Sequence, residues 1–167
     1  LTSPADKLAF YQRELAPGKM KSGRGSLKDH NKDGSVDWKD LTFHQERIYK
    51  LTDTDRDGVA DKITIFAEGF NSPVSGIAAG VLYFDGWVYV TAIPDVWRLK
   101  DTDGDGVADL KEVIATGFGG HIAYAGHDMH GLRLGPDGRI YWTVGDKGAN
   151  VISKEGRRFA YPHEGCV

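Results

Sequence analysis

The stretch D-T-D-G-D-G-V-A-D-L-K-E, from Asp101 to Glu112, occurs twice in this chain and indicates the fold more clearly than any other. An earlier copy starts at Asp53, and segments 48–70 and 96–118 align without a gap at an offset of 48 residues. In a repeat of this kind each unit packs its apolar face on a neighbour, and β-propeller blades have periods of roughly 40–50 residues. The repeat therefore predicts an all-β chain built of propeller blades.

The acidic residues of the repeated loop are spaced as ligands of a hard cation. Carboxylates at positions 1, 3, 5 and 9, with glycine at position 6, can wrap oxygen atoms around calcium. β-Branched and aromatic residues flank the loop, so we expect it at the tip of a β-hairpin, where it resembles the calcium loops of integrin propellers more than an EF-hand. The alternative is a solvated Asp/Gly-rich turn without metal. The predicted ligands are Asp53, Asp55, Asp57, the Val59 carbonyl and Asp61 in the first copy, and Asp101, Asp103, Asp105, the Val107 carbonyl, Asp109 and Glu112 in the second.

A third loop, D-H-N-K-D-G-S-V-D-W-K-D, matches the same pattern less closely. It places Asn at position 3 and Asp at position 12, both oxygen ligands that calcium accepts. The ligands predicted here are Asp29, Asn31, Asp33, Ser35, Asp37 and Asp40.

Hairpin signals surround the second loop. The turn Asp85-Gly86 between two alternating apolar runs predicts a β-hairpin, and segments 96–99 and 110–115 complete a four-stranded blade. A further hairpin, 131–144, opens the next blade, which is unfinished at Val167. Because a propeller needs four to eight blades, we expect a partial propeller whose edge strands are covered by the rest of the propeller polypeptide.

The chain before the third loop differs in character. Ser3 and Pro4 predict the start of a helix, which Pro17-Gly18 ends, and a basic, glycine-bearing loop follows. We therefore divide the chain into an N-terminal helix and basic loop, 1–28, and an incomplete propeller domain of two to three blades, 29–167.

Composition excludes several classes. The formal charge is −3 and no basic stripe predicts nucleic-acid binding. Apolar runs stay well short of the roughly 20 residues that cross a bilayer, so the chain is not predicted to be transmembrane. Leu1 indicates a processed or trimmed chain, and Cys166 is the only cysteine. Calcium is abundant outside the cytosol, which favours a periplasmic or extracellular location.

The stretch between the two blades, from Gly117 to Gly148, is Gly-rich and carries His121, His127 and His130. Histidine is the natural proton acceptor near neutral pH and needs a carboxylate to orient it; Asp146 follows the strand that would return to the same end of the blade. The alternatives are histidines that only hydrogen-bond loop carbonyls, and a transition-metal site of His121, His127 and His130.

The segment from His127 through Gly135-Pro136-Asp137 to Gly145-Asp146 resembles the catalytic stretch of soluble glucose dehydrogenases that use pyrroloquinoline quinone. Residues 47–167, with both D-T-D-x-D-G-V-A-D loops, F-N-S-P and G-H-D-M-H-G-L-R, resemble exported sorbosone/glucose dehydrogenase-like proteins, which often carry a c-type cytochrome domain.

This resemblance implies a six-bladed propeller that oxidises a sugar or alcohol with a quinone cofactor and passes electrons to a cytochrome. It assigns His127 as general base and Asp146 as its carboxylate, and it offers His127, Asp128 and His130 as cofactor contacts. The glucose dehydrogenases have Asp before the catalytic histidine, whereas this chain has Gly126 there. Two alternatives stay open: a calcium-stabilised binding or assembly subunit of a redox complex, and a calcium-dependent lactonase.

Overall fold

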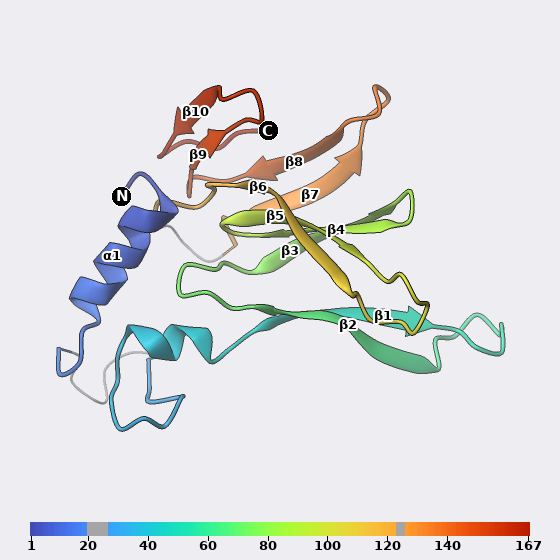
Figure 1. Cartoon of the computed structure of the whole chain (residues 1–167), viewed down its shortest axis with the longest axis horizontal. Coiled ribbons are helices and arrows are strands. Elements are labelled where there is room, and N and C mark those ends of the chain that lie inside the picture. Colours follow the sequence, from blue (N-terminus) through green and yellow to red (C-terminus); the bar gives the residue numbers. More distant parts are fainter. Residues whose placement is uncertain (20–26, 123–125) are drawn as a thin grey trace.

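The computed structural model describes residues 1–19, 27–122 and 126–167. Within them the chain is mostly β structure, with ten strands in four small antiparallel sheets that stay open (Figure 1). The strands are β1 (Glu46–Thr52), β2 (Lys62–Phe70), β3 (Ala78–Phe84), β4 (Trp87–Ala92), β5 (Asp95–Lys100), β6 (Leu110–Thr116), β7 (Met129–Leu134), β8 (Ile140–Val144), β9 (Ala149–Ile152) and β10 (Arg158–Tyr161). The described helices are α1 (Pro4–Glu14) and a 3₁₀ helix (Trp38–Thr42), and none is long and apolar enough to cross a membrane.

The predicted start of α1 is confirmed. Ser3 is the N-cap, its hydroxyl accepts a hydrogen bond from the Asp6 N–H, and Pro4 takes the first helical position. The basic loop predicted after Gly18 falls largely in 20–26, outside the described residues.

The predicted four-stranded antiparallel meander is also confirmed, in the order β3-β4-β5-β6. Asp85 and Gly86 join β3 to β4 with φ of 49° and 76°, the two positive values that a tight type I′ hairpin turn requires. Among the described residues β1 pairs only with β2, and β7 pairs with β8.

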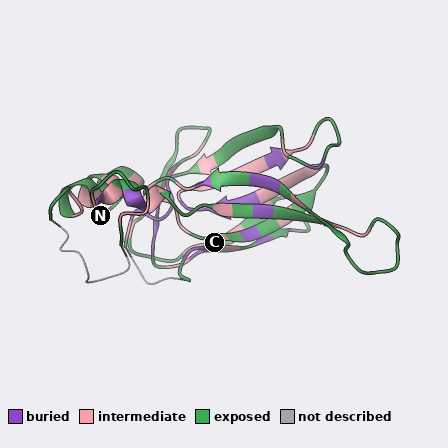
Figure 2. Ribbon diagram, turned by 90° about the horizontal axis from the view of Figure 1, so that it is seen from below, coloured by how far each residue is buried: buried purple, intermediate pink, exposed green. Residues whose placement is uncertain are grey.

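Two apolar clusters lie on opposite faces of this four-stranded sheet. Figure 2 shows how buried segments alternate with exposed ones along the strands. One joins Val90 and Leu99 to Ile48 and Phe66 of the β1–β2 sheet. The other joins the sheet, through Val96, to residues of β7, β8 and β9, namely Met129, Val144 and Ala149. Alternate residues of a strand face opposite sides, so each sheet packs its inner face on the next as a stack of layers.

The last described residues return to the β7–β8 sheet. Cys166 exchanges both backbone hydrogen bonds with Val144 of β8, at 2.9 and 3.0 Å, in an isolated β-bridge. The chain between Val144 and Cys166 forms the hairpin β9–β10, which lies beside the end of β6. There the Asn150 N–H donates to the Gly117 carbonyl (2.8 Å). This hairpin is not predicted by the sequence, because its strands, A-N-V-I and R-F-A-Y, are only four residues long and too short to show a clear period.

Candidate functional site

The two repeated loops have the same internal hydrogen bonds. The carboxylate at position 1 accepts the N–H of the glycine at position 6: Asp53 from Gly58 at 2.8 Å, and Asp101 from Gly106 at 2.9 Å. The carboxylate at position 5 accepts the N–H of position 7, at 2.7 Å in both loops. These bonds turn the side chains inward, and two groups of acidic oxygen atoms lie within 4.8 Å of one another: Asp53, Asp55 and Asp57; and Asp101, Asp103 and Asp109.

Some predicted ligands are engaged elsewhere. Glu112 lies in β6, where its carboxylate pairs with Arg98 at 2.6 Å, so the structure does not bring it to the loop. The position-9 carboxylates, Asp61 and Asp109, accept from the N–H and hydroxyl of the threonine at position 2. Asp109 still stands within the second acidic group, whereas Asp61 does not stand within the first.

The third loop keeps the first part of this network and changes the last. Asp29 accepts from Gly34 at 3.1 Å, and Asp33 from Ser35 at 2.9 Å, as in the other loops. Buried Asp40, at position 12, accepts from the N–H groups of His30, Asn31 and Asp37, while Asp37 caps the 3₁₀ helix that starts at Trp38. The structure therefore ties Asp37 and Asp40 to the backbone instead of gathering them with Asp29 and Asn31.

Hydrogen-bond donors within the loops lower the pKa of three of the carboxyl groups, those of Asp53, Asp61 and Asp101. The Gly58 N–H lowers the pKa of Asp53, and the Thr54 hydroxyl lowers that of Asp61. Burial alone would raise the pKa of Asp101, but the N–H groups of Gly104 and Gly106 outweigh it and the pKa is lowered. Ionised oxygens are the form that a divalent cation binds.

The predicted histidine–carboxylate pair is present. His127 Nδ1 lies 2.7 Å from Asp146 Oδ1, and both side chains are about half exposed. The pairing of β7 with β8 explains this contact: Met129 is opposite Val144 and His130 is opposite Thr143, so the same register continued beyond the strand ends puts His127 opposite Asp146. His127 precedes β7 and Asp146 follows β8, and in Figure 1 this end of the two strands lies opposite to the loops that join β1 to β2 and β5 to β6.

The other candidates near His127 have different surroundings. His130 Nε2 contacts the Gly126 carbonyl at 2.8 Å, and the His121 ring meets the His163 ring edge-on at 4.8 Å. The three histidines predicted as a metal site therefore do not gather, and the groups of three that could hold a metal in the described part of the chain are the two acidic ones. Residues 123–125 of this connection lie outside the described residues.

Asp128 lies beneath the surface, 1% exposed, and its Oδ2 accepts from Lys147 Nζ at 2.9 Å. Lys147 was not predicted from the sequence, because a lysine in the Gly-rich turn G-D-K-G is expected on the surface. Lys7 of α1 was also missed: it is buried and donates to the carbonyls of Val74 and Gly119.

Comparison with known proteins gives one finding. No curated protein and no solved structure matches this sequence. A family model described as "Domain of unknown function (DUF7133)" matches residues 11–163, nearly the whole chain. The chain therefore belongs to the DUF7133 family.

Proposed function

We propose that this chain is part of an exported β-propeller dehydrogenase that oxidises a hydroxyl group of a sugar or alcohol, with His127 as general base. The observation that carries the proposal is the 2.7 Å contact between His127 Nδ1 and Asp146 Oδ1. A carboxylate at Nδ1 fixes the imidazole tautomer with Nε2 as proton acceptor and stabilises the cation that forms. The ring is about half exposed, so a substrate hydroxyl can reach it.

The oxidation needs an acceptor for the hydride, and the family resemblance offers pyrroloquinoline quinone, which supplies that acceptor when bound. The described residues of this chain could supply the general base of such a site, but not the groups that would bind the quinone. A quinone with several carboxylates needs cations, whereas Lys7 and Lys147 are buried and already engaged with carbonyls and with Asp128. Cationic side chains from other blades would have to hold the cofactor, and a c-type cytochrome would receive the electrons.

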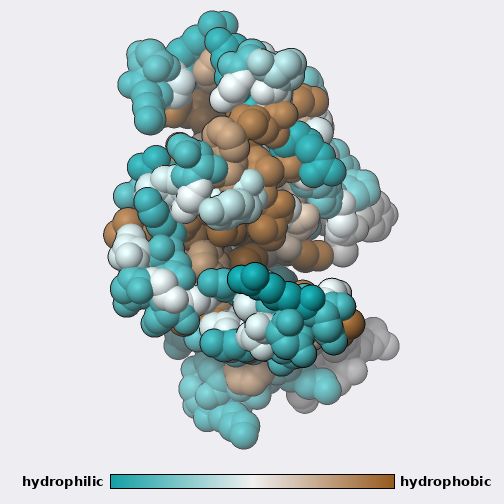
Figure 3. Space-filling model, turned by 90° about the vertical axis from the view of Figure 1, so that its right-hand side faces the viewer, coloured by the Kyte–Doolittle hydropathy of each residue, from teal (hydrophilic) through white to brown (hydrophobic). Residues whose placement is uncertain are grey.

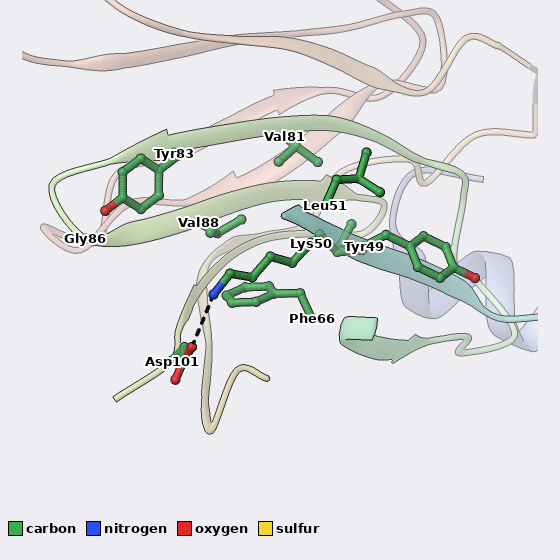
Figure 4. Close-up of a pocket in the computed structure, with 10 residues that line it drawn as sticks. Tyr49, Lys50, Leu51, Phe66, Val81, Tyr83, Gly86, Val88 and Asp101 are labelled. Carbon is green, nitrogen blue, oxygen red and sulfur yellow. Dashed lines mark ion pairs between the residues drawn. The ribbon is translucent and has the colours of Figure 1, made fainter. Parts of the chain in front are cut away.

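The propeller architecture is supported by the comparison of the two repeat units. β1 and β2 occupy the repeat positions of β5 and β6, yet the inner edge of β1 lacks the counterpart of β4 within the described residues. A groove of about 410 Å³ lies there, lined by residues that include Tyr49, Leu51, Val81 and Tyr83 (Figure 4). On the face of the molecule shown in Figure 3, hydrophobic residues (brown) are also exposed between groups of hydrophilic ones (teal). Further blade strands from the rest of the polypeptide would cover these surfaces.

Calcium is proposed as a structural ion of the loops at Asp53 and Asp101, with the loop at Asp29 as a weaker third site. The two loops that join β1 to β2 and β5 to β6 lie at the opposite end of the strands from the start of β7, which His127 precedes, so calcium in these two loops would stabilise the hairpins without touching substrate (Figure 1). That separation disfavours a calcium-dependent lactonase. It favours, as the second candidate, a calcium-stabilised binding or assembly subunit of a periplasmic or extracellular redox complex.

The test uses the full-length protein with calcium and pyrroloquinoline quinone added. We expect aldoses or alcohols to reduce an artificial electron-acceptor dye, and acid denaturation to release the quinone absorbance. Absence of both, in folded protein, would overturn the dehydrogenase and leave the binding subunit. If the dye is reduced but no quinone is released, the cofactor assignment would be wrong, whereas the assignment of His127 as general base would stand.

A further inference from the structure

A second ionic contact links the same two segments as His127 and Asp146, on their buried side. Asp128 follows His127 in the sequence, Lys147 follows Asp146, and Lys147 Nζ donates to Asp128 Oδ2 over 2.9 Å. The side chains of Asp128 and Lys147 are 1% and 11% exposed, against 47% and 51% for His127 and Asp146. The segments 127–128 and 146–147 are therefore joined by two neighbouring contacts, an exposed one between His127 and Asp146 and a buried one between Asp128 and Lys147.

The surroundings of Asp128 hold its carboxylate in one place. A methyl group added at Gly76 would collide with Asp128 Oδ1, so the loop before β3 closes directly on the carboxylate. Oδ1 is buried without a hydrogen-bond partner among the described residues. Lys147 is then the one described side chain that hydrogen-bonds this carboxylate, and the position of each depends on the other.

The N-terminal helix closes this cluster from a third side. Lys7 Nζ donates to the Val74 carbonyl at 3.3 Å and the Gly119 carbonyl at 3.4 Å. Burial, followed by the charge of Lys147, lowers the pKa of Lys7 to about 8, while Asp128 opposes the shift. Asp128 thus carries the negative charge between two buried cations.

Buried ion pairs contribute little net stability, because desolvation offsets their attraction, but they can specify register. We propose that Asp128 and Lys147 are positioning residues, whose ion pair sets the spacing between the segments 126–128 and 145–148 and so keeps His127 Nδ1 hydrogen-bonded to Asp146. The catalytic consequence rests on the proposed function, whereas the geometric claim rests on these contacts alone.

The tautomer of His127 reports the geometry without any assay of activity. In the folded 167-residue chain, long-range ¹H–¹⁵N NMR distinguishes a proton on Nδ1 from one on Nε2, and His127→Gln assigns the signal. We expect the Nδ1–H form in the wild type. In the double variant Asp128→Asn/Lys147→Met, which removes both charges of this ion pair together, we expect the two tautomers to mix.

The matched control is Arg98→Met/Glu112→Gln, which removes an exposed cross-strand ion pair of 2.6 Å between β5 and β6. It should leave the His127 signal unchanged. Gly76→Ala is a second probe, because it displaces the Asp128 carboxylate while keeping both charges. An unchanged Nδ1–H signal in a folded form of either Asp128-directed variant overturns the proposal; a mixed signal in both supports it.

Turnover in the full-length protein separates this inference from the proposed function. If the tautomer mixes and kcat falls while KM changes little, both hold. If the tautomer mixes in a protein that has no activity even as wild type, the positioning role stands and the dehydrogenase fails.

Discussion

Leu51 and Leu99 occupy the same position of the 48-residue repeat, yet Leu51 is 63% exposed and Leu99 is fully buried. Leu99 lies in β5 opposite Val88 of β4, whereas Leu51 lies in β1, whose corresponding edge has no described partner strand. Identical side chains in equivalent strands therefore differ because of what pairs with the strand.

This difference predicts unequal mutational costs. Leu99→Ala should lower the free energy of unfolding of the 167-residue chain by about 2–5 kcal/mol, because it opens a cavity. Leu51→Ala should change it by less than about 0.5 kcal/mol, as for a surface position. Urea unfolding measures both. In the full-length protein, a covered β1 edge would make Leu51→Ala costly as well, and a neutral effect there would contradict the propeller.

Removal of calcium is expected to destabilise the fold. An ion that binds only the folded chain raises stability by about 2.7 kcal/mol at a hundredfold excess over Kd, so chelation should lower the melting temperature. Asp103→Ala should remove one bound ion in metal analysis. Asp137→Asn is the control, since this carboxylate belongs to an ordinary turn and accepts from the Tyr141 hydroxyl. Equal melting temperatures with and without chelator, and no bound metal, would leave the loops as plain turns.

Loss of the proposed base should slow turnover. His127→Ala in the full-length holoenzyme is expected to reduce the rate by roughly 10²–10⁴, the usual size of general-base catalysis, with calcium content and melting temperature retained. His130→Ala should mainly alter substrate affinity, because its ring contacts a loop carbonyl. Steady-state kinetics of both variants provide the measurement, and comparable losses of kcat in the two would remove the distinction.

The buried amine of Lys7 predicts a dependence on alkaline pH. Burial lowers its pKa to about 8 in the folded chain, against 10.5 for an ordinary lysine. Between these values the unfolded chain binds more protons, so the contribution of Lys7 to stability rises with pH. The free energy of unfolding of the wild type minus that of Lys7→Met should therefore increase from pH 8 to pH 10. Using the difference cancels other groups, such as Cys166, whose pKa is raised by burial. A difference that stays flat would show that Lys7 is not buried as a cation.

The local parts of the structure were predictable from the sequence. The start of α1, the hairpin turn at Asp85 and the turns of the acidic loops follow from interactions between residues a few positions apart. Such interactions depend on residue type and spacing, and both can be read directly from the sequence. The sequence also paired His127 with Asp146, by the resemblance of that segment to a known catalytic stretch.

Contacts between distant segments were decided by the tertiary structure. The spacing of the loop predicts Glu112 as a calcium ligand. In the structure, however, β5 pairs with β6 so that Glu112 lies opposite Arg98, and its carboxylate forms an ion pair with that side chain. Lys7 and Asp128 look like surface charges in the sequence, and only the closure of α1 and the loop at Gly76 buries them. Likewise, Leu51 and Leu99 are the same residue in the same repeat position, and their burial differs because burial is a property of the neighbours that packing brings to a side chain.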